Sequence, residues 1–183
     1  LVIVSPNYDW DPQLQKLAQF AAGELKLVVK VFKGFTKDGI EKFITYMGEC
    51  KNQGMRSTIY IDDPVGIGQF TSSVNQKSPF NSFVTGIKHF KSDMIFSTQA
   101  IGSLSPSARE NIDVFIFLPN SVARPKLYDA CPFVDSRADF YKLMDHYASE
   151  PYHAIWINLK FGRKGIFRIN AQGQISPITS IPA

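Results

Sequence analysis

The chain has 183 residues and a mass of 20.6 kDa, which suits one domain and is too short for two full domains. Hydrophobic residues make up 44% of it and charged residues 20%, an ordinary globular composition that excludes disordered, collagen-like and coiled-coil classes. The formal net charge of +4 is compatible with a nucleic-acid partner but does not identify one.

Strand-like and helix-like patterns alternate along the first two thirds of the chain. Residues 1–4 are an apolar run, and Asp11 with Pro12 provides the N-cap and first residue of a helix whose apolar face is Leu14, Leu17, Ala18 and Ala21. Further strands are predicted at residues 27–32, 58–61, 94–98 and 114–118, with helices at about 37–51 and after the Ser-Pro pairs at 78–79 and 105–106. Because the strands are apolar throughout, they predict an α/β fold with a parallel sheet covered by helices on both faces.

The last part of the chain has a different pattern. A helix is predicted at about residues 137–147, followed by two strand-like runs, 154–159 and 165–169, that flank the sequence KFGRK at 160–164. This pattern indicates a C-terminal β-hairpin with a basic tip, which is either simply solvated or in contact with a phosphate backbone. Since no linker divides the chain, we expect a single domain over residues 1–183, with a core at 1–118 and a C-terminal extension at 119–183.

Two carboxylates, Asp62 and Asp63, end the apolar strand at 58–61. Ligands of open α/β sheets bind at the carboxyl ends of the strands, where one acid can hold a Mg²⁺ ion on nucleotide phosphates and the other can activate a water. Alternatively, both acids cap a turn before Pro64. Gln99 has the matching position one strand later and is either a γ-phosphate sensor or a turn residue.

The sequence gives weaker evidence for a phosphate-binding arginine and none for a zinc site, a disulfide framework or a membrane span. Arg109 can reach a phosphate in its own or a neighbouring subunit, or pair with a nearby acid on the surface. Cys50 and Cys131 lack CxxC spacing and the three histidines lack HxH or HExxH spacing, so neither zinc nor a disulfide framework is indicated. No window approaches the roughly 20 apolar residues of a membrane span, and we expect no membrane partner.

The order of these motifs resembles the DNA-packaging ATPases of double-stranded DNA viruses. The resemblance is to the poxvirus-like branch of the FtsK/HerA superfamily, with forms in virophages and self-synthesising transposons. It covers residues 1–118 and is carried by LVIVSPNYDWDP at 1–12, IYIDD at 59–63, FVTGIKH at 83–89, IFSTQ at 95–99 and REN at 109–111.

This resemblance implies a P-loop NTPase fold of the RecA-like or ASCE type, with ATP and Mg²⁺ as cofactors. It makes Asp62 the metal-linked acid of a Walker B motif, Asp63 the acid that activates water, and Gln99 the polar sensor. In the family a basic residue just before the sensor strand is a candidate arginine finger, where this chain has Lys88 followed by histidine. The finger role therefore falls to Lys88 or to Arg109, whose planar fork suits phosphate better, with Arg56 and Arg124 as the next candidates.

The family's phosphate-binding loop, GxxxxGK followed by Ser or Thr, does not occur in the 183 residues. Since that loop precedes the family strand that residues 1–4 resemble, we expect a fragment that starts after it, or else a degenerate protein. The function implied is the C-terminal part of an ATP-driven motor that moves double-stranded DNA into a capsid, inactive by itself. Its partners would be DNA, a homo-oligomeric ring and capsid proteins, in the virion or the viral factory in the host cytoplasm and not in a secretory pathway. The alternatives are a non-catalytic binding module that retains the fold and a cellular DNA translocase.

Overall fold

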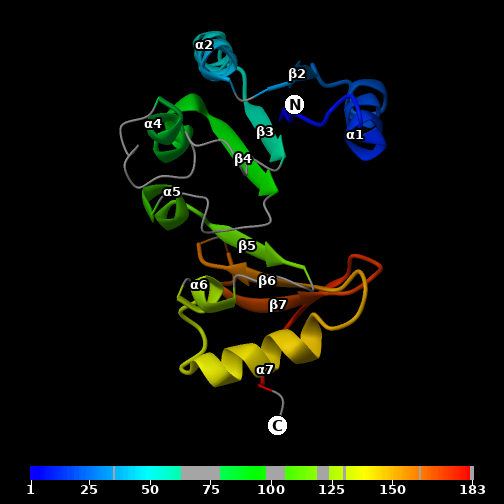
Figure 1. Cartoon of the computed structure of the whole chain (residues 1–183), viewed down its shortest axis with the longest axis vertical. Coiled ribbons are helices and arrows are strands. Elements are labelled where there is room, and N and C mark those ends of the chain that lie inside the picture. Colours follow the sequence, from blue (N-terminus) through cyan, green and yellow to red (C-terminus); the bar gives the residue numbers. More distant parts are fainter. Residues whose placement is uncertain are drawn as a thin grey trace. The chain divides into compact units, whose positions relative to one another are not determined.

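The computed structural model describes residues 1–34, 36–62, 79–97, 106–118, 124–129, 131–160 and 162–181. The chain divides into two compact units, one of residues 1–99 and 103–109 and the other of residues 100–102 and 110–183 (Figure 1). Each unit has its own sheet and is described by itself. That the whole chain is one domain stays a prediction.

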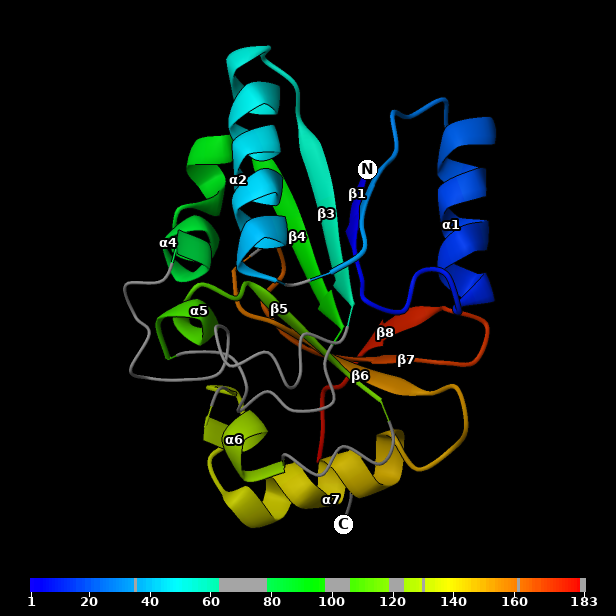
Figure 2. The same cartoon turned by 45° about the horizontal axis from the view of Figure 1, so that its top comes forward.

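The first unit contains a parallel sheet of four strands in the order β2-β1-β3-β4. The strands are β1 (Val2–Val4), β2 (Lys30–Phe32), β3 (Ser57–Asp62) and β4 (Ser92–Ser97). The helices are α1 (Pro12–Gly23), α2 (Lys37–Asn52), α4 (Pro79–Thr85), the 3-10 helix η2 (Ile87–Phe90) and α5 (Pro106–Glu110). Figures 1 and 2 show α2 and α4 on one side of this sheet and α1 on the other, which confirms the expected α/β class.

The helices begin at the residues that the capping patterns predict. The Asp11 carboxylate accepts hydrogen bonds from the backbone N–H groups of Gln13 and Leu14 at 2.8 and 3.3 Å, and Pro12 begins α1. Leu14, Ala18 and Ala21 are buried as expected. Leu17 is not, because 38% of it is exposed, so the buried stripe of α1 is narrower than its apolar pattern.

The core of the first unit lies between the sheet and α2. Phe43 and Met47 of α2 are almost fully buried, as are Ile59 and Ile61 of β3. The ring of Phe43 also meets that of Phe83 in α4 edge to face, with centroids 5.0 Å apart. Since side chains alternate along a strand, Tyr60 and Asp62 of β3 point to the opposite face of the sheet.

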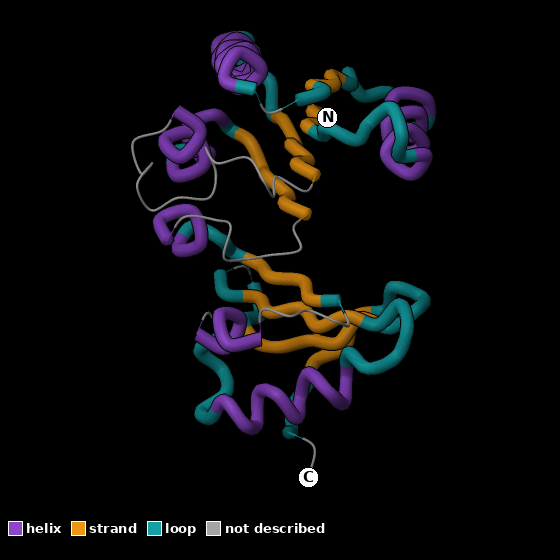
Figure 3. The backbone as a smooth tube through the Cα atoms, viewed as in Figure 1, coloured by secondary structure: helices purple, strands orange, loops and turns teal. Residues whose placement is uncertain are grey.

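The second unit contains an antiparallel sheet in the order β5-β6-β7-β8. Its elements are β5 (Val114–Phe117), α6 (Arg124–Asp129), α7 (Arg137–Tyr147), β6 (Ala154–Asn158), β7 (Gly165–Ile169) and β8 (Ile175–Pro177) (Figure 3). One face of the sheet forms a core with α7, in which Phe140 and Leu143 of the helix and Ile155 and Ile157 of β6 are almost fully buried. The β6–β7 pair confirms the predicted hairpin.

The strand at residues 114–117 differs from its prediction in one respect. It was expected as a fifth strand of the parallel sheet, but β5 pairs antiparallel with β6, with Phe115 opposite Ile157. Phe115 and Phe117 are buried, whereas 59% of Ile116 is exposed. The strand is thus buried on one face only. Because all its residues are apolar, the sequence does not show which face is exposed.

None of the described helices is long and apolar enough to cross a membrane.

Candidate functional site

The carboxyl edge of the parallel sheet brings polar residues of three strands together. Val4 of β1 is in register with Ile61 of β3, and Asp62 of β3 with Ser97 of β4. Ser5 follows β1 directly, so Ser5, Asp62 and Ser97 stand in a row across the ends of three parallel strands. This edge is where open α/β sheets bind their ligands.

Ser5 and Asp62 are joined by a hydrogen bond. The Ser5 hydroxyl donates to Oδ2 of Asp62 over 3.0 Å and accepts from the backbone N–H of Asn7 over 3.1 Å. Ser5 is completely buried and Asp62 is half-buried. The backbone N–H of Ser5 donates to the carbonyl of Phe32 at 3.0 Å. Hydrogen bonds therefore hold both the backbone and the side chain of Ser5. The serine therefore holds the carboxylate in one orientation.

Tyr60 adds a phenol to the same face of the sheet. Burial raises the pKa of Tyr60, a hydrogen bond with the Ser97 side chain acts against this, and the carboxylates of Asp62 and Asp11 raise the pKa further. The phenol is thus neutral at physiological pH and close enough to both carboxylates to interact with them. Asp11 is the N-cap of α1, so a helix start also faces this edge.

This arrangement fits the chemistry of a magnesium ion on nucleotide phosphates. Mg²⁺ prefers hard oxygen ligands and is commonly bound by one or two carboxylates, with phosphates and waters completing its shell. The second carboxylate oxygen of Asp62, Oδ1, has no recorded partner among the described residues. Within those residues there is also no group of three or more His, Cys, Asp or Glu side chains that could hold a metal alone. Asp62 can therefore supply one ligand to a metal that phosphates also bind.

The structure brings only some of the predicted site residues to this edge. Asp62 is there, while Asp63 and Gln99 lie outside the described residues. Lys88 is exposed on η2, which precedes the amino end of β4. Six residues of β4 at about 3.3 Å each separate the two edges of the sheet, about 20 Å, so Lys88 and Asp62 of one chain do not meet.

Three arginines are the other candidates for the finger. Arg109 is half-buried in the last turn of α5. Arg56 is exposed just before β3, at the same amino edge as Lys88. The Arg124 side chain is outside the described part of the chain. None of the four is thereby assigned a role, and the finger stays a prediction.

Ser5 and Tyr60 were missed by the sequence reasoning. Ser5 directly follows the apolar run at residues 1–4 and was given no role, and Tyr60 was counted as one residue of an apolar strand. A usable signal was present for Ser5, because a small polar residue directly after an apolar strand falls on the ligand edge of a parallel sheet. The strand order that places it beside Asp62 cannot be read from the chain.

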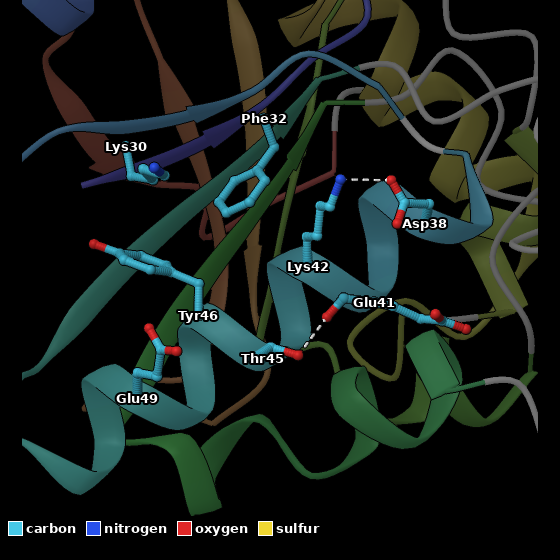
Figure 4. A pocket seen from close by; sticks show the side chains of 8 residues that line it. All are labelled: Lys30, Phe32, Asp38, Glu41, Lys42, Thr45, Tyr46 and Glu49. Carbon is cyan, nitrogen blue, oxygen red and sulfur yellow. Dashed lines mark hydrogen bonds and ion pairs between the residues drawn. The ribbon is translucent and has the colours of Figure 1, made fainter.

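A groove lies between β2 and α2, and Asp62 is not among the residues that line it. It has a volume of about 450 Å³ and is lined by Lys30, Phe32, Asp38, Glu41, Lys42, Thr45, Tyr46 and Glu49 (Figure 4). The Lys30 ammonium lies 5.9 and 5.8 Å from the ring centroids of Phe32 and Tyr46, and Lys42 pairs with Asp38 at 2.7 Å. Its two lysines and three acids mix both signs of charge, so the groove favours neither anions nor cations.

Comparison with known proteins relates this architecture to viral packaging enzymes. No family model matches the chain, and no curated protein matches its sequence. Among solved structures, the DNA-packaging ATPase B204 of Sulfolobus turreted icosahedral virus superposes with a TM-score of 0.57 at 13% identity, over 97% of this chain and 82% of that one.

The genome-packaging NTPase B204 of Sulfolobus turreted icosahedral virus 2 is also similar. Its complex with AMP gives a TM-score of 0.56 at 13% identity, over 99% of this chain and 83% of that one. Its complex with AMPPCP gives 0.53 at 14% identity, over 98% of each chain. At this level of identity the likeness establishes the fold: the chain has the fold of viral genome-packaging ATPases.

Proposed function

We propose that this chain is the C-terminal part of an ATP-hydrolysing motor of the FtsK/HerA superfamily that moves double-stranded DNA into a viral capsid. The observation that carries the proposal is the Ser5–Asp62 pair at the carboxyl edge of the parallel sheet, within a fold shared with viral genome-packaging ATPases. A carboxylate oriented at that edge is what a magnesium–nucleotide complex requires.

In this function Asp62 binds the Mg²⁺ of Mg·ATP, which would neutralise charge developing on the phosphates. Ser5 keeps the carboxylate turned toward the metal by its 3.0 Å hydrogen bond. Asp63 accepts a proton from the attacking water, and Gln99 senses the γ-phosphate. The outer oxygens of the γ-phosphate need a cation as well, which we assign to Arg109 or Lys88.

A basic residue supplied by a neighbouring copy implies a homo-oligomeric ring. Double-stranded DNA and capsid proteins would be the partners of that ring, in the virion or the viral factory of the host cytoplasm. The structural neighbours support the packaging role, because they are genome-packaging enzymes, one of them with ATP-gammaS bound.

The metal role of Asp62 can be tested on the 183-residue chain. Mn²⁺ replaces Mg²⁺, and the electron paramagnetic resonance of free Mn²⁺ reports binding of Mn·AMPPCP. We expect weak but saturable binding that Asp62→Asn reduces by about tenfold or more, or about 1.4 kcal/mol. The control is Asp93→Asn, which removes an exposed carboxylate from the other end of the same sheet. Equal effects of the two substitutions would show that Asp62 is not a metal ligand.

A non-catalytic binding module is the second candidate. It is favoured by one sequence observation, since no GxxxxGK motif followed by Ser or Thr occurs in the 183 residues. Such a module would bind its partner independently of nucleotide. Unchanged Mn·AMPPCP binding by Asp62→Asn would support it over the ATPase.

A further inference from the structure

The excess of basic over acidic residues in the chain lies in the last part of its sequence. Residues 151–183 contain Lys160, Arg163, Lys164 and Arg168 and no aspartate or glutamate. Four cations equal the whole formal net charge of +4, so residues 1–150 are formally neutral. A polyanion that approaches the protein is therefore attracted to this segment.

Three of the four cations lie between β6 and β7, and we name the described residues there, 159–160 and 162–164, the basic turn. Its two ends are paired in register, with Asn158 opposite Gly165. The side-chain Nδ2 of Asn158, only 6% exposed, donates to the carbonyl of Arg163 at 3.1 Å. The backbone N–H of Leu159 donates to the carbonyl of Asp113 at 2.9 Å. The turn is thus tied to the sheet at both ends.

The cations of the basic turn differ in whether an acid already pairs with them. Arg163 and Lys164 are both exposed, and no ion pair is recorded for either within the described residues. The Lys160 ammonium, by contrast, lies 2.8 Å from Oδ1 of Asp113, so much of its charge is already neutralised. Arg168 is on β7 and donates to the Ser176 hydroxyl at 2.9 Å. Arg163 and Lys164 are therefore the cations of the basic turn that remain available to a ligand.

We propose that the basic turn binds the phosphate backbone of double-stranded DNA through Arg163 and Lys164, an inference that rests on the proposed packaging function. The guanidinium fork of Arg163 can bridge two phosphate oxygens, and the Lys164 ammonium adds a point charge beside it. The anchored backbone reduces the ordering cost of binding. Such contacts are independent of base sequence, as transport of a whole genome requires.

The test is DNA binding by the whole chain, measured by the fluorescence anisotropy of a short labelled duplex over a series of salt concentrations. Arg163→Gln with Lys164→Gln removes both cations from the turn. Two phosphate contacts contribute about 1.8 to the slope of log affinity against log salt, so we expect the slope to fall by that amount. At about 0.1 M salt the same contacts are worth roughly 60-fold in affinity.

A matched control separates the turn from net charge. Lys16→Gln with Lys26→Gln lowers the charge equally at exposed positions of the first unit, and we expect a loss of only about twofold. Equal losses in the two double variants would overturn the proposal, as would tighter binding of single-stranded RNA or anionic vesicles than of duplex DNA. Circular dichroism checks that both variants are folded.

The experiment distinguishes this inference from the proposed function. If the wild-type chain binds duplex DNA and the turn variant binds it equally well, the basic turn is not the contact, while the packaging function stands. If the wild-type chain does not bind DNA even at low salt, both the inference and the DNA part of the function are wrong. The Asp62-dependent binding of Mn·AMPPCP would then still identify a nucleotide site.

Discussion

Replacing Ser5 by alanine should loosen the carboxyl edge of the parallel sheet by an amount that the structure allows us to estimate. The substitution removes a hydrogen bond of 3.0 Å to the Asp62 carboxylate and one of 3.1 Å from the backbone N–H of Asn7. A hydrogen bond to a charged group contributes about 1.5–3 kcal/mol and a neutral one about 1 kcal/mol. Because Asp62 is only half-buried, water replaces part of its loss, and we expect a cost of about 2 kcal/mol.

A double-mutant cycle with Asp62→Asn isolates the Ser5–Asp62 term. The asparagine oxygen can still accept from Ser5, but a neutral acceptor is roughly half as strong as a carboxylate. The two substitutions should therefore couple by about 1 kcal/mol. Ser92→Ala is the matched control, because Ser92 is also a buried serine of this sheet, with its hydroxyl on the Phe90 carbonyl at 2.9 Å. It lies at the other end of β4 and should not couple to Asp62.

Since the chain has two compact units, the assay must report on the first one alone. Hydrogen exchange of the β1 and β3 amides, followed by mass spectrometry, gives the free energy of opening for that region. Additive effects of Ser5→Ala and Asp62→Asn, within about 0.3 kcal/mol, would refute the claim that the serine holds the carboxylate. An equal coupling with Ser92→Ala would refute it as well.

Three further predictions concern single residues. Burial raises the pKa of the Cys131 thiol, so a disulfide reagent should modify it slowly in the native protein and fast in urea; fast native reaction would contradict its burial. The raised pKa of Tyr60 contributes stability below about pH 10, and this contribution is lost as the pH rises through the folded-state pKa. The free energy of unfolding of the wild type, relative to that of Tyr60→Phe, should therefore fall above about pH 10. Gly162 and Gly23 both have open space where a Cβ would be, but Gly162 has φ +52°. In denaturation experiments Gly162→Ala should lower the free energy of unfolding by about 1 kcal/mol, and Gly23→Ala should raise it by about 0.5–1 kcal/mol. Equal effects of the two substitutions would mean that backbone conformation is not the cause.

The sequence predicts most of the elements because local chemistry determines them. The start of α1 follows from Asp11 and Pro12, whose capping geometry needs no tertiary contact. The β6–β7 hairpin follows from two apolar runs around a glycine-containing turn. Exposure is less predictable: Leu17 and Ile116 are apolar in pattern but 38% and 59% exposed. An exposed apolar residue such as Ile116 makes a half-buried strand look like a fully buried one in the sequence.

Only the part of the site that belongs to a single strand can be predicted from the sequence. Asp62 was identified because it ends a single apolar strand, which is a local observation. Ser5 was not, since its partnership with Asp62 depends on β1 lying between β2 and β3. That order arises from crossover connections, and 57 residues separate the two side chains in the sequence. Pairs of this kind require the fold.

The sheet also separates the two candidates for a finger. Lys88 precedes the amino end of β4, and Asp62 ends β3 at the opposite edge, about 20 Å away by the rise of the strands. A lysine side chain cannot cover that span, so Lys88 can act on a phosphate bound at Asp62 only from another copy of the chain. Arg109 follows β4 along the sequence and carries no such restriction. A finger at Lys88 therefore requires the ring, whereas hydrolysis by a single subunit would exclude Lys88 and be compatible with Arg109.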